Sequence, residues 1–375
     1  MDLIQPWFDA ARSVLPVGTP VWDAHTHTGW NDPDGVRGTA DRLIEKLDAA
    51  NQAGAVVTTS MDPSGYPANN DRVLGEAEAS NGRLIPFLRI DPHTGAEAPK
   101  ELNRSLDLGH RGVKLHPRGE AFSLADPLVD PILQVAAERG VPVLVHAGRG
   151  IPTLGRDAID RCESVPGLNL ILAHAGISDL SWMGPVAGEV PGLHFDTAWW
   201  DITDLLSLFA WVPPERILYA SDTPYGHPML GFILAMRAAA ASGYRGSRLA
   251  DLFGGTLQRL LTGVTSEPVT APPGGRFQID HGLLRLHANL QAAVVRAFAR
   301  VDVSEPFSLA RLACVVPEND PHYSVYKAIG ETLAHIDPKA TRGIVRPLIA
   351  LTAAALTPEV AVPASNREWL VDTGG

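Results

Sequence analysis

Short apolar runs rich in β-branched residues recur along the chain as far as Asp222. They return about every thirty residues, which is the length of one strand–helix–strand unit. Between them lie loops and segments whose apolar positions repeat with a helical period. The eight expected strands are Val21–His25, Ala55–Ser60, Leu84–Ile90, Gly112–His116, Val141–His146, Leu168–His174, Leu193–Asp196 and Arg216–Asp222.

These strands are expected to be parallel and covered on both faces, because continuous apolar runs such as Val141–Val145 are typical of such strands. Helix signals alternate with the strands: Thr39 is placed to cap one helix and Pro127 to open another. The alternation predicts an α/β fold of the (β/α)₈ TIM-barrel type. A doubly wound open sheet is the runner-up, disfavoured because no glycine-rich phosphate turn follows the first strand.

The chain continues well past the eighth expected strand. Asp251–Leu261 is expected to be the closing helix of a barrel domain that spans residues 1–263. A Pro/Gly-rich stretch predicts a linker over 264–280, and the pattern of 281–375 predicts a helical C-terminal extension. This extension either covers the barrel mouth or forms a homodimer contact. Its expected helices are His281–Arg300, Tyr323–Ile336 and Thr341–Leu356.

Composition narrows the class of protein. The 375 residues are 45% hydrophobic and 19% charged, which is typical of a globular enzyme, and the net charge is -11. Such an acidic chain is a poor partner for nucleic acid or for a membrane surface. With two cysteines, no signal-peptide pattern and no long apolar stretch, the expected location is the cytoplasm.

Chemistry-bearing residues stand where the expected strands end, and in a parallel barrel these ends form the active-site rim. His25 and His27 lie two residues apart on the first strand, so both point to one face. The fifth strand ends at His146, the sixth at His174 and the eighth at Asp222. A single buried histidine is more often a hydrogen-bonded core residue. Histidines and a carboxylate gathered on one rim instead predict a site for a divalent metal.

With these residues in place, the chain resembles the amidohydrolase superfamily. The strand-end sequences His146-Ala147-Gly148, His174-Ala175-Gly176 and Ser221-Asp222-Thr223-Pro224 are similar to its amidohydrolase-related branch. That branch contains hydrolases, hydratases and decarboxylases similar to aminocarboxymuconate semialdehyde decarboxylase. The resemblance covers roughly residues 20–263 and leaves the C-terminal extension outside.

The resemblance implies roles for the rim residues. His25, His27 and His146 would ligate the metal, and Asp222 would be a ligand, a proton acceptor, or both in turn. His174 would be a catalytic base beside the metal or a substrate contact. The expected ion is Zn²⁺, with Mn²⁺ as the alternative, and one ion is favoured over two.

Lys114 and His116 share the inward face of the fourth expected strand. In two-metal members of the superfamily a strand-four lysine is carboxylated and bridges the ions, so Lys114 is either such a bridge or a group that binds substrate or a nearby carboxylate. His116 either contacts substrate or makes a structural hydrogen bond.

Further residues are placed near the substrate. Arg89, at the end of the third strand, is either a clamp for a substrate carboxylate or part of an ion pair with Asp91 or Asp196. Tyr225, like Trp199, Trp200 and His227, falls in a rim loop and could line the pocket.

The sequence thus favours a metal-dependent hydrolase that cleaves an amide, lactone or ester bond of a small molecule. A metal-dependent decarboxylase on the same barrel is the alternative, because the ligand set is common to both. A non-catalytic binding barrel is a further alternative, which the complete ligand set disfavours.

Overall fold

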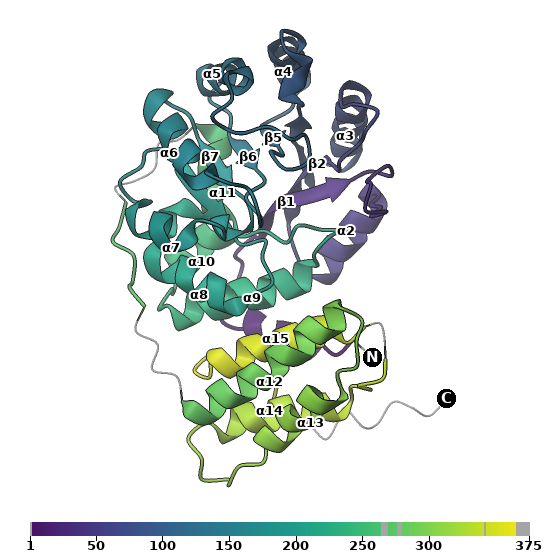
Figure 1. Ribbon diagram of the computed structural model, residues 1–375, viewed down its shortest axis with the longest axis vertical. Coiled ribbons are helices and arrows are strands. Elements are labelled where there is room, and N and C mark those ends of the chain that lie inside the picture. Colours follow the sequence, from purple (N-terminus) through teal and green to yellow (C-terminus); the bar gives the residue numbers. More distant parts are fainter. Residues whose placement is uncertain (1, 264–268, 276–279, 341–342, 365–375) are drawn as a thin grey trace.

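A computed structural model describes residues 2–263, 269–275, 280–340 and 343–364. Its strands are parallel and follow one another in chain order around a barrel (Figure 1). They form two hydrogen-bonded sheets, β1–β2–β3 and β4 to β9. The strands are β1 (Trp22–Thr28), β2 (Gly54–Thr59), β3 (Leu84–Pro86), β4 (Leu88–Arg89), β5 (Val113–Leu115), β6 (Val143–Val145), β7 (Leu170–Leu172), β8 (Leu193–Asp196) and β9 (Ile217–Leu218).

Two sets of backbone contacts join these sheets into a closed barrel. The third expected strand is divided at Phe87 into β3 and β4, and the Phe87 N–H donates to the Val57 carbonyl while the Leu88 N–H donates to Gly112. At Phe87 the strand therefore stops pairing with β2 and begins to pair with β5. On the other side, the Asp222 N–H donates to the His25 carbonyl, which places β1 beside the end of β9. The (β/α)₈ TIM barrel predicted from the sequence is confirmed.

Helices follow the strands and cover the outside of the barrel (Figure 1). Thr39 caps the first of them as expected, accepting a hydrogen bond from the Arg42 N–H. The barrel helices are α2 (Ala40–Ala49), α3 (Pro67–Ala79), α4 (Glu97–Leu108), α5 (Asp130–Glu138), α6 (Leu154–Ser164), α7 (Leu180–Met183), α8 (Ile202–Trp211), α9 (Pro228–Ala241), α10 (Ser247–Ala250) and α11 (Thr256–Thr262).

The inside of the barrel is filled by apolar side chains from alternate strand positions, such as Val56, Leu144 and Ile171. Leu257 and Leu260 of α11 belong to the same cluster. The helix expected over Asp251–Leu261 is broken at Gly254. Its second part, α11, packs against the barrel interior and closes the end of the barrel opposite the rim. The rim end stays free for the side chains that carry the chemistry.

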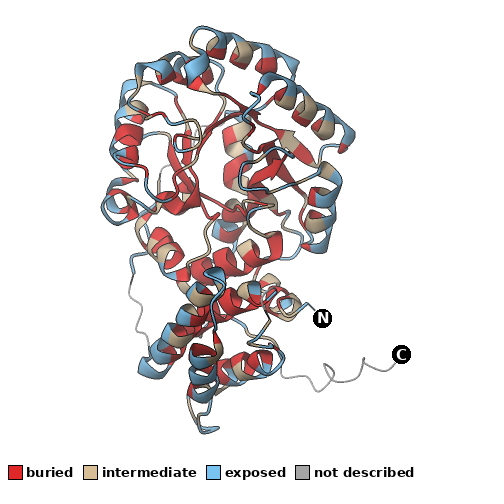
Figure 2. Cartoon of the chain, turned by 45° about the vertical axis from the view of Figure 1, so that its right-hand side comes forward, coloured by how far each residue is buried: buried red, intermediate tan, exposed pale blue. Residues whose placement is uncertain are grey.

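The C-terminal helices form a compact unit against α8 and α9 (Figure 1). They are α12 (His281–Phe298), α13 (Ser304–Ala313), α14 (Tyr323–Ala334) and α15 (Val345–Leu356). The N-terminal helix α1 (Gln5–Arg12) packs between the two parts, with Phe8 against Phe232 of α9 and the Trp7 indole donating to Thr332 of α14. Buried residues extend through this junction as they do through the barrel (Figure 2).

The helical extension is confirmed in kind, and α12, α14 and α15 match the three expected helices to within a few residues. The sequence pattern did not single out α1 or α13. Most of the predicted linker 264–280, the start of the helix expected at 341 and the end of the extension after 364 lie outside the described residues. Within the described part of the chain, no helix is long and apolar enough to cross a membrane.

Candidate metal centre

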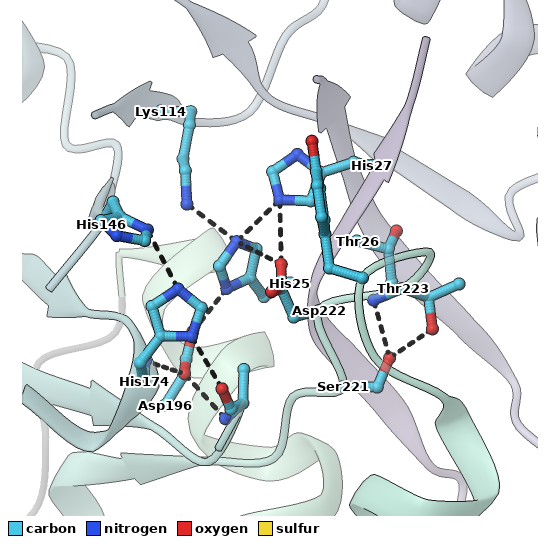
Figure 3. A network of polar contacts seen from close by, with 12 residues as sticks. His25, Thr26, His27, Lys114, His146, His174, Asp196, Ser221, Asp222 and Thr223 are labelled. Carbon is cyan, nitrogen blue, oxygen red and sulfur yellow. Dashed lines mark hydrogen bonds and ion pairs between the residues drawn. The ribbon is translucent and has the colours of Figure 1, made fainter. Parts of the chain in front are cut away.

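Three side chains at the barrel rim bring one ligand atom each to a common point (Figure 3). The Nε2 atoms of His25 and His27 are 3.0 Å apart. Asp222 Oδ1 lies 3.5 Å from the first and 3.2 Å from the second. All these atoms fall within 4.8 Å of one another, which is the spacing expected of donors that surround one ion at about 2.0–2.1 Å.

Local backbone conformation aims these groups. The alternation of β1 points both histidines into the barrel, as the sequence predicted. Asp222 and His174 leave their strands with φ of 58° and 56°, in the left-handed region that non-glycine residues seldom adopt. Strained conformations of this kind persist where the surrounding structure holds them, and they cluster at functional sites.

Asp196, at the end of β8, orients His25. Its Oδ2 lies 2.9 Å from His25 Nδ1, and its Oδ1 accepts hydrogen bonds from the backbone N–H groups of His174 and Ala198. Because the carboxylate must accept, Nδ1 of His25 carries the proton and Nε2 presents its lone pair to the centre. The sequence interpretation had considered Asp196 only as an ion-pair partner of Arg89. Its place at the end of the seventh strand was the available signal for this role.

The two histidines of β1 are held neutral, the form in which imidazole binds metals. Burial lowers the pKa of His25 well below its ordinary value, and the charge of Lys114 adds to the effect. Burial also lowers the pKa of His27. Burial alone would raise the pKa of Asp222, but its contact with His27 and the charge of Lys114 bring the pKa below the usual value, which favours the ionised carboxylate.

His146 and His174 form a hydrogen-bonded pair beside His25, His27 and Asp222 (Figure 3). His174 Nδ1 donates to the Ala198 carbonyl at 2.7 Å, so the Nε2 of a neutral His174 ring accepts from His146 Nδ1 at 3.0 Å. The remaining His146 nitrogen, Nε2, is buried and has no hydrogen-bond partner in the described chain. His146 lies outside the group of three, so its expected role as a metal ligand stays a prediction, for which this unpartnered nitrogen is available.

Lys114 lies on β5, and His116 directly follows that strand, so both side chains reach the site from β5. Lys114 Nζ is buried and lies 2.8 Å from His25 Nε2, and burial lowers its pKa to about 8. This position is compatible with either of its two expected roles. His116 stacks on His146 with ring centroids 3.9 Å apart and planes 8° apart, and its Nδ1 accepts from the Gly119 N–H.

Arg89 lies in the same pocket but pairs with a residue that the sequence interpretation missed. Its guanidinium donates to Glu120 Oε1 at 2.7 Å, and the Tyr66 hydroxyl donates to the same oxygen. The expected pairing of Arg89 with Asp91 or Asp196 is wrong, because Asp91 instead caps a short 3₁₀ turn and contacts His93. Glu120 lies in the loop after β5, five residues beyond the end of the strand rather than at it, so no sequence pattern marked it.

The rim opens into a large cavity of about 1530 Å³. The loop residues Trp199, Trp200, Tyr225 and His227 all line it, as expected. Tyr225 packs edge-on against His27 and donates its hydroxyl to Asp32. Residues of α12 and α15 line the far side of this cavity, so the C-terminal unit contributes to the wall of the site.

Comparisons with known proteins agree with this architecture. A family model described as amidohydrolase matches residues 22–255, and no curated protein matches the sequence. The structure is similar to 5-carboxyvanillate decarboxylase from Sphingomonas paucimobilis, at 14% identity and a TM-score of 0.52, covering 65% of this chain and 99% of that one. It is also similar to 2,6-dihydroxybenzoate decarboxylase from Rhizobium, at 16% identity and a TM-score of 0.50, with 65% and 99% covered.

An uncharacterised TIM-barrel protein from Bordetella bronchiseptica is similar at 16% identity and a TM-score of 0.53, again covering 65% of this chain and 99% of that one. At these identities the likeness shows the fold alone. The family match runs from the start of β1 past β9, covers more than half of the chain and contains every rim residue described above. The chain therefore belongs to the amidohydrolase family.

Proposed function

We propose that this protein is a metal-dependent hydrolase that cleaves an amide, lactone or ester bond of a small molecule. The convergence of His25 Nε2, His27 Nε2 and Asp222 Oδ1 on one point carries the proposal. The donor set of neutral imidazoles and one carboxylate suits Zn²⁺ or a similar divalent ion. His146, whose buried Nε2 has no hydrogen-bond partner in the described chain, would supply a further ligand.

A divalent ion bound by these residues would activate water and polarise the carbonyl group of the substrate. Asp222 is ionised and is therefore able to accept a proton at its carboxylate. Asp196 keeps His25 in the tautomer that exposes Nε2. Lys114 Nζ, poised beside His25, would stabilise negative charge that develops on the substrate.

Decarboxylation on the same residues is a second candidate, favoured by the cations of the pocket. Arg118 and Arg346 line the cavity, and neither of them forms an ion pair within the described chain. A substrate carboxylate would satisfy such a group. Two structural neighbours carry the name of decarboxylases, which agrees with this candidate.

Metal loading tests the proposal. The purified chain is expected to take up one Zn²⁺ ion, measured by elemental analysis after dialysis. His27→Ala and Asp222→Asn should abolish this uptake and lower turnover by several orders of magnitude while the circular dichroism spectrum stays unchanged. His93→Ala is the matched control, because His93 is exposed and contacts Asp91 away from the centre.

A panel of lactones, amides, esters and aromatic acids then separates the two reactions. Hydrolysed product without CO₂ supports the hydrolase, and CO₂ from a carboxylated substrate supports the decarboxylase. If the metal-loaded chain turns over no member of the panel, the non-catalytic barrel is the better interpretation. A chain that takes up no divalent ion would contradict the proposal outright.

A further inference from the structure

An aromatic wall runs from the candidate metal centre to the C-terminal unit. It consists of Trp199 and Trp200 in the loop after β8 and Phe298 at the end of α12. The ring centroids of His174 and Trp199 are 6.2 Å apart, those of Trp199 and Trp200 5.9 Å, and those of Trp200 and Phe298 5.2 Å. All three residues of the wall line the cavity.

Polar contacts hold both the loop that carries the two tryptophans and the helix that carries Phe298 in place. The Trp199 indole N–H donates to Asp204 at 2.6 Å, which anchors the rim loop to α8. The Gln291 side chain of α12 donates to Asp201 at 2.9 Å, which fastens the C-terminal unit to the same loop. A wall fixed in this way is already organised for binding, so a ligand would not have to order it.

Apolar side chains at the far end of the wall are only half covered by protein. Phe298 is 51% exposed and Val295, one helical turn earlier, is 52% exposed, and both face the cavity. Their exposure to water is unfavourable, and an apolar ligand lying along the wall would relieve it.

Arg149 lies over this wall and makes no direct ion pair among the described residues, although its charge acts on the nearby Asp204 carboxylate. Its guanidinium is 5.1 Å from the centroid of Trp199 and 5.7 Å from that of Trp200. Among the described residues it forms no ion pair and no side-chain hydrogen bond. Stacking occupies the face of a guanidinium and leaves its edge N–H groups free to bind a carboxylate in bidentate fashion.

We propose that Arg149, Trp199, Trp200 and Phe298 form a substrate subsite beside the metal centre for an extended molecule whose carboxylate binds Arg149 over Trp199 and whose apolar body runs along the wall toward Phe298. Phe298 makes the C-terminal unit, which lies outside the family match, a determinant of specificity. A cavity of about 1530 Å³ exceeds the roughly 300–1,000 Å³ of common ligand pockets, which agrees with a substrate longer than a small acid. The inference rests on the proposed function only in placing the reacting bond at the metal end.

Binding of a model ligand tests the subsite without any turnover. Isothermal titration calorimetry of the zinc-loaded chain would use 2-naphthoate and its neutral counterpart 2-naphthylmethanol. Arg149→Gln should weaken 2-naphthoate by about tenfold or more and leave 2-naphthylmethanol nearly unchanged, because only the carboxylate loses a charged hydrogen bond. Phe298→Ala should weaken both ligands by about three- to tenfold, because both lose the aromatic contact.

Matched controls come from the same chain. Arg156 lies on α6, the helix that follows Arg149, and its guanidinium is 5.2 Å from the centroid of the Trp182 ring. Because Arg156 does not line the cavity, Arg156→Gln should leave both affinities unchanged. Leu312→Ala removes an exposed apolar side chain of the C-terminal unit away from the cavity and should also have no effect.

The proposal is overturned if Arg149→Gln weakens 2-naphthoate no more than Arg156→Gln does, or if Phe298→Ala acts no differently from Leu312→Ala. The outcome is separable from that of the proposed function. Arg149-dependent binding in a chain that hydrolyses nothing would keep the subsite and reject the hydrolase. Hydrolysis by a chain in which neither Arg149→Gln nor Phe298→Ala changes ligand binding would keep the hydrolase and reject the subsite.

Discussion

At the scale of single residues, hydrogen-bond partners decide which nitrogen of each histidine is available to a metal. Asp196 accepts from His25, and the Ala198 carbonyl accepts from His174. Both contacts come from β8 or the loop after it, which therefore orients one group on β1 and another in the turn after β7. The protonation pattern of the site is set by backbone and carboxylate acceptors, and these lie far from the ligands in sequence.

Asp196→Asn is expected to weaken zinc binding by about 10- to 100-fold with little loss of thermal stability. The asparagine oxygen can still accept from the backbone of His174 and Ala198, but its amide group then faces His25 Nδ1 and favours the wrong tautomer. A chelator-competition titration measures the change.

Asp91→Asn provides the comparison, because Asp91 also follows a strand but contacts only its own loop. Wild-type zinc affinity in Asp196→Asn, or an equal loss in both variants, would reject the orienting role.

At the scale of elements, β8 carries two buried polar side chains on its inward face, two residues apart. Asp196 stands at the rim, and His194 lies deeper, where its Nδ1 donates to the Gly192 carbonyl and Arg216 approaches its Nε2 at 3.5 Å. Burial and the charge of Arg216 lower the pKa of His194 to about 3. One strand thus holds a neutral histidine in the interior and a carboxylate at the site.

The pH dependence of stability should report His194. Its pKa is about 3 in the folded chain and near 6.5 when exposed, so only the unfolded chain binds the proton between these values. The stabilising contribution is complete above pH 6.5 and declines as the pH falls toward 3, by up to about 1.4 kcal/mol per pH unit. Urea unfolding between pH 7.5 and 4.5 should show a shallower decline for His194→Gln than for the wild type.

His335→Gln serves as the control for this series, because His335 is exposed on the C-terminal unit. Its decline should match that of the wild type. Parallel curves for His194→Gln and the wild type would show that His194 is not held neutral.

At the scale of the whole molecule, α9 joins the barrel to the C-terminal unit. It packs against α1, α8 and α15, and most of its side chains are buried. Arg237 of α9 is fully buried and donates to the side chain and carbonyl of Thr357 and to the carbonyl of Ala361. The unit that carries Phe298 is therefore bound to the barrel by both apolar packing and a buried polar contact.

Arg237→Met should lower the free energy of unfolding by about 3 kcal/mol, because the carbonyl groups of Thr357 and Ala361 lose a charged donor in a buried place. Chemical denaturation followed by circular dichroism measures the change. Arg245→Met removes an exposed arginine that bonds only to carbonyls near the end of the same helix, and it should cost far less. Equal effects in the two variants would contradict a joining role for Arg237.

Much of the barrel could be predicted, since a parallel strand covered on both faces leaves a continuous apolar run that is visible without any knowledge of its neighbours. Two features of the fold have only a weak pattern of apolar positions and were not predicted. The break at Phe87 depends on which neighbour each half of the strand pairs with. The helix α13 mixes polar and apolar positions over a short length, and the sequence pattern did not mark it.

The sequence by itself determined the barrel, the end of each strand that carries chemistry, and the residues His25, His27 and Asp222 as metal-site candidates. Periodicity and strand polarity are local properties, so the sequence displays them directly. Only the tertiary structure decided that Arg89 pairs with Glu120, that Asp196 orients His25 and that Phe298 reaches the pocket. These contacts join segments far apart in the chain, and the packing of whole elements, rather than any local pattern, brings them together.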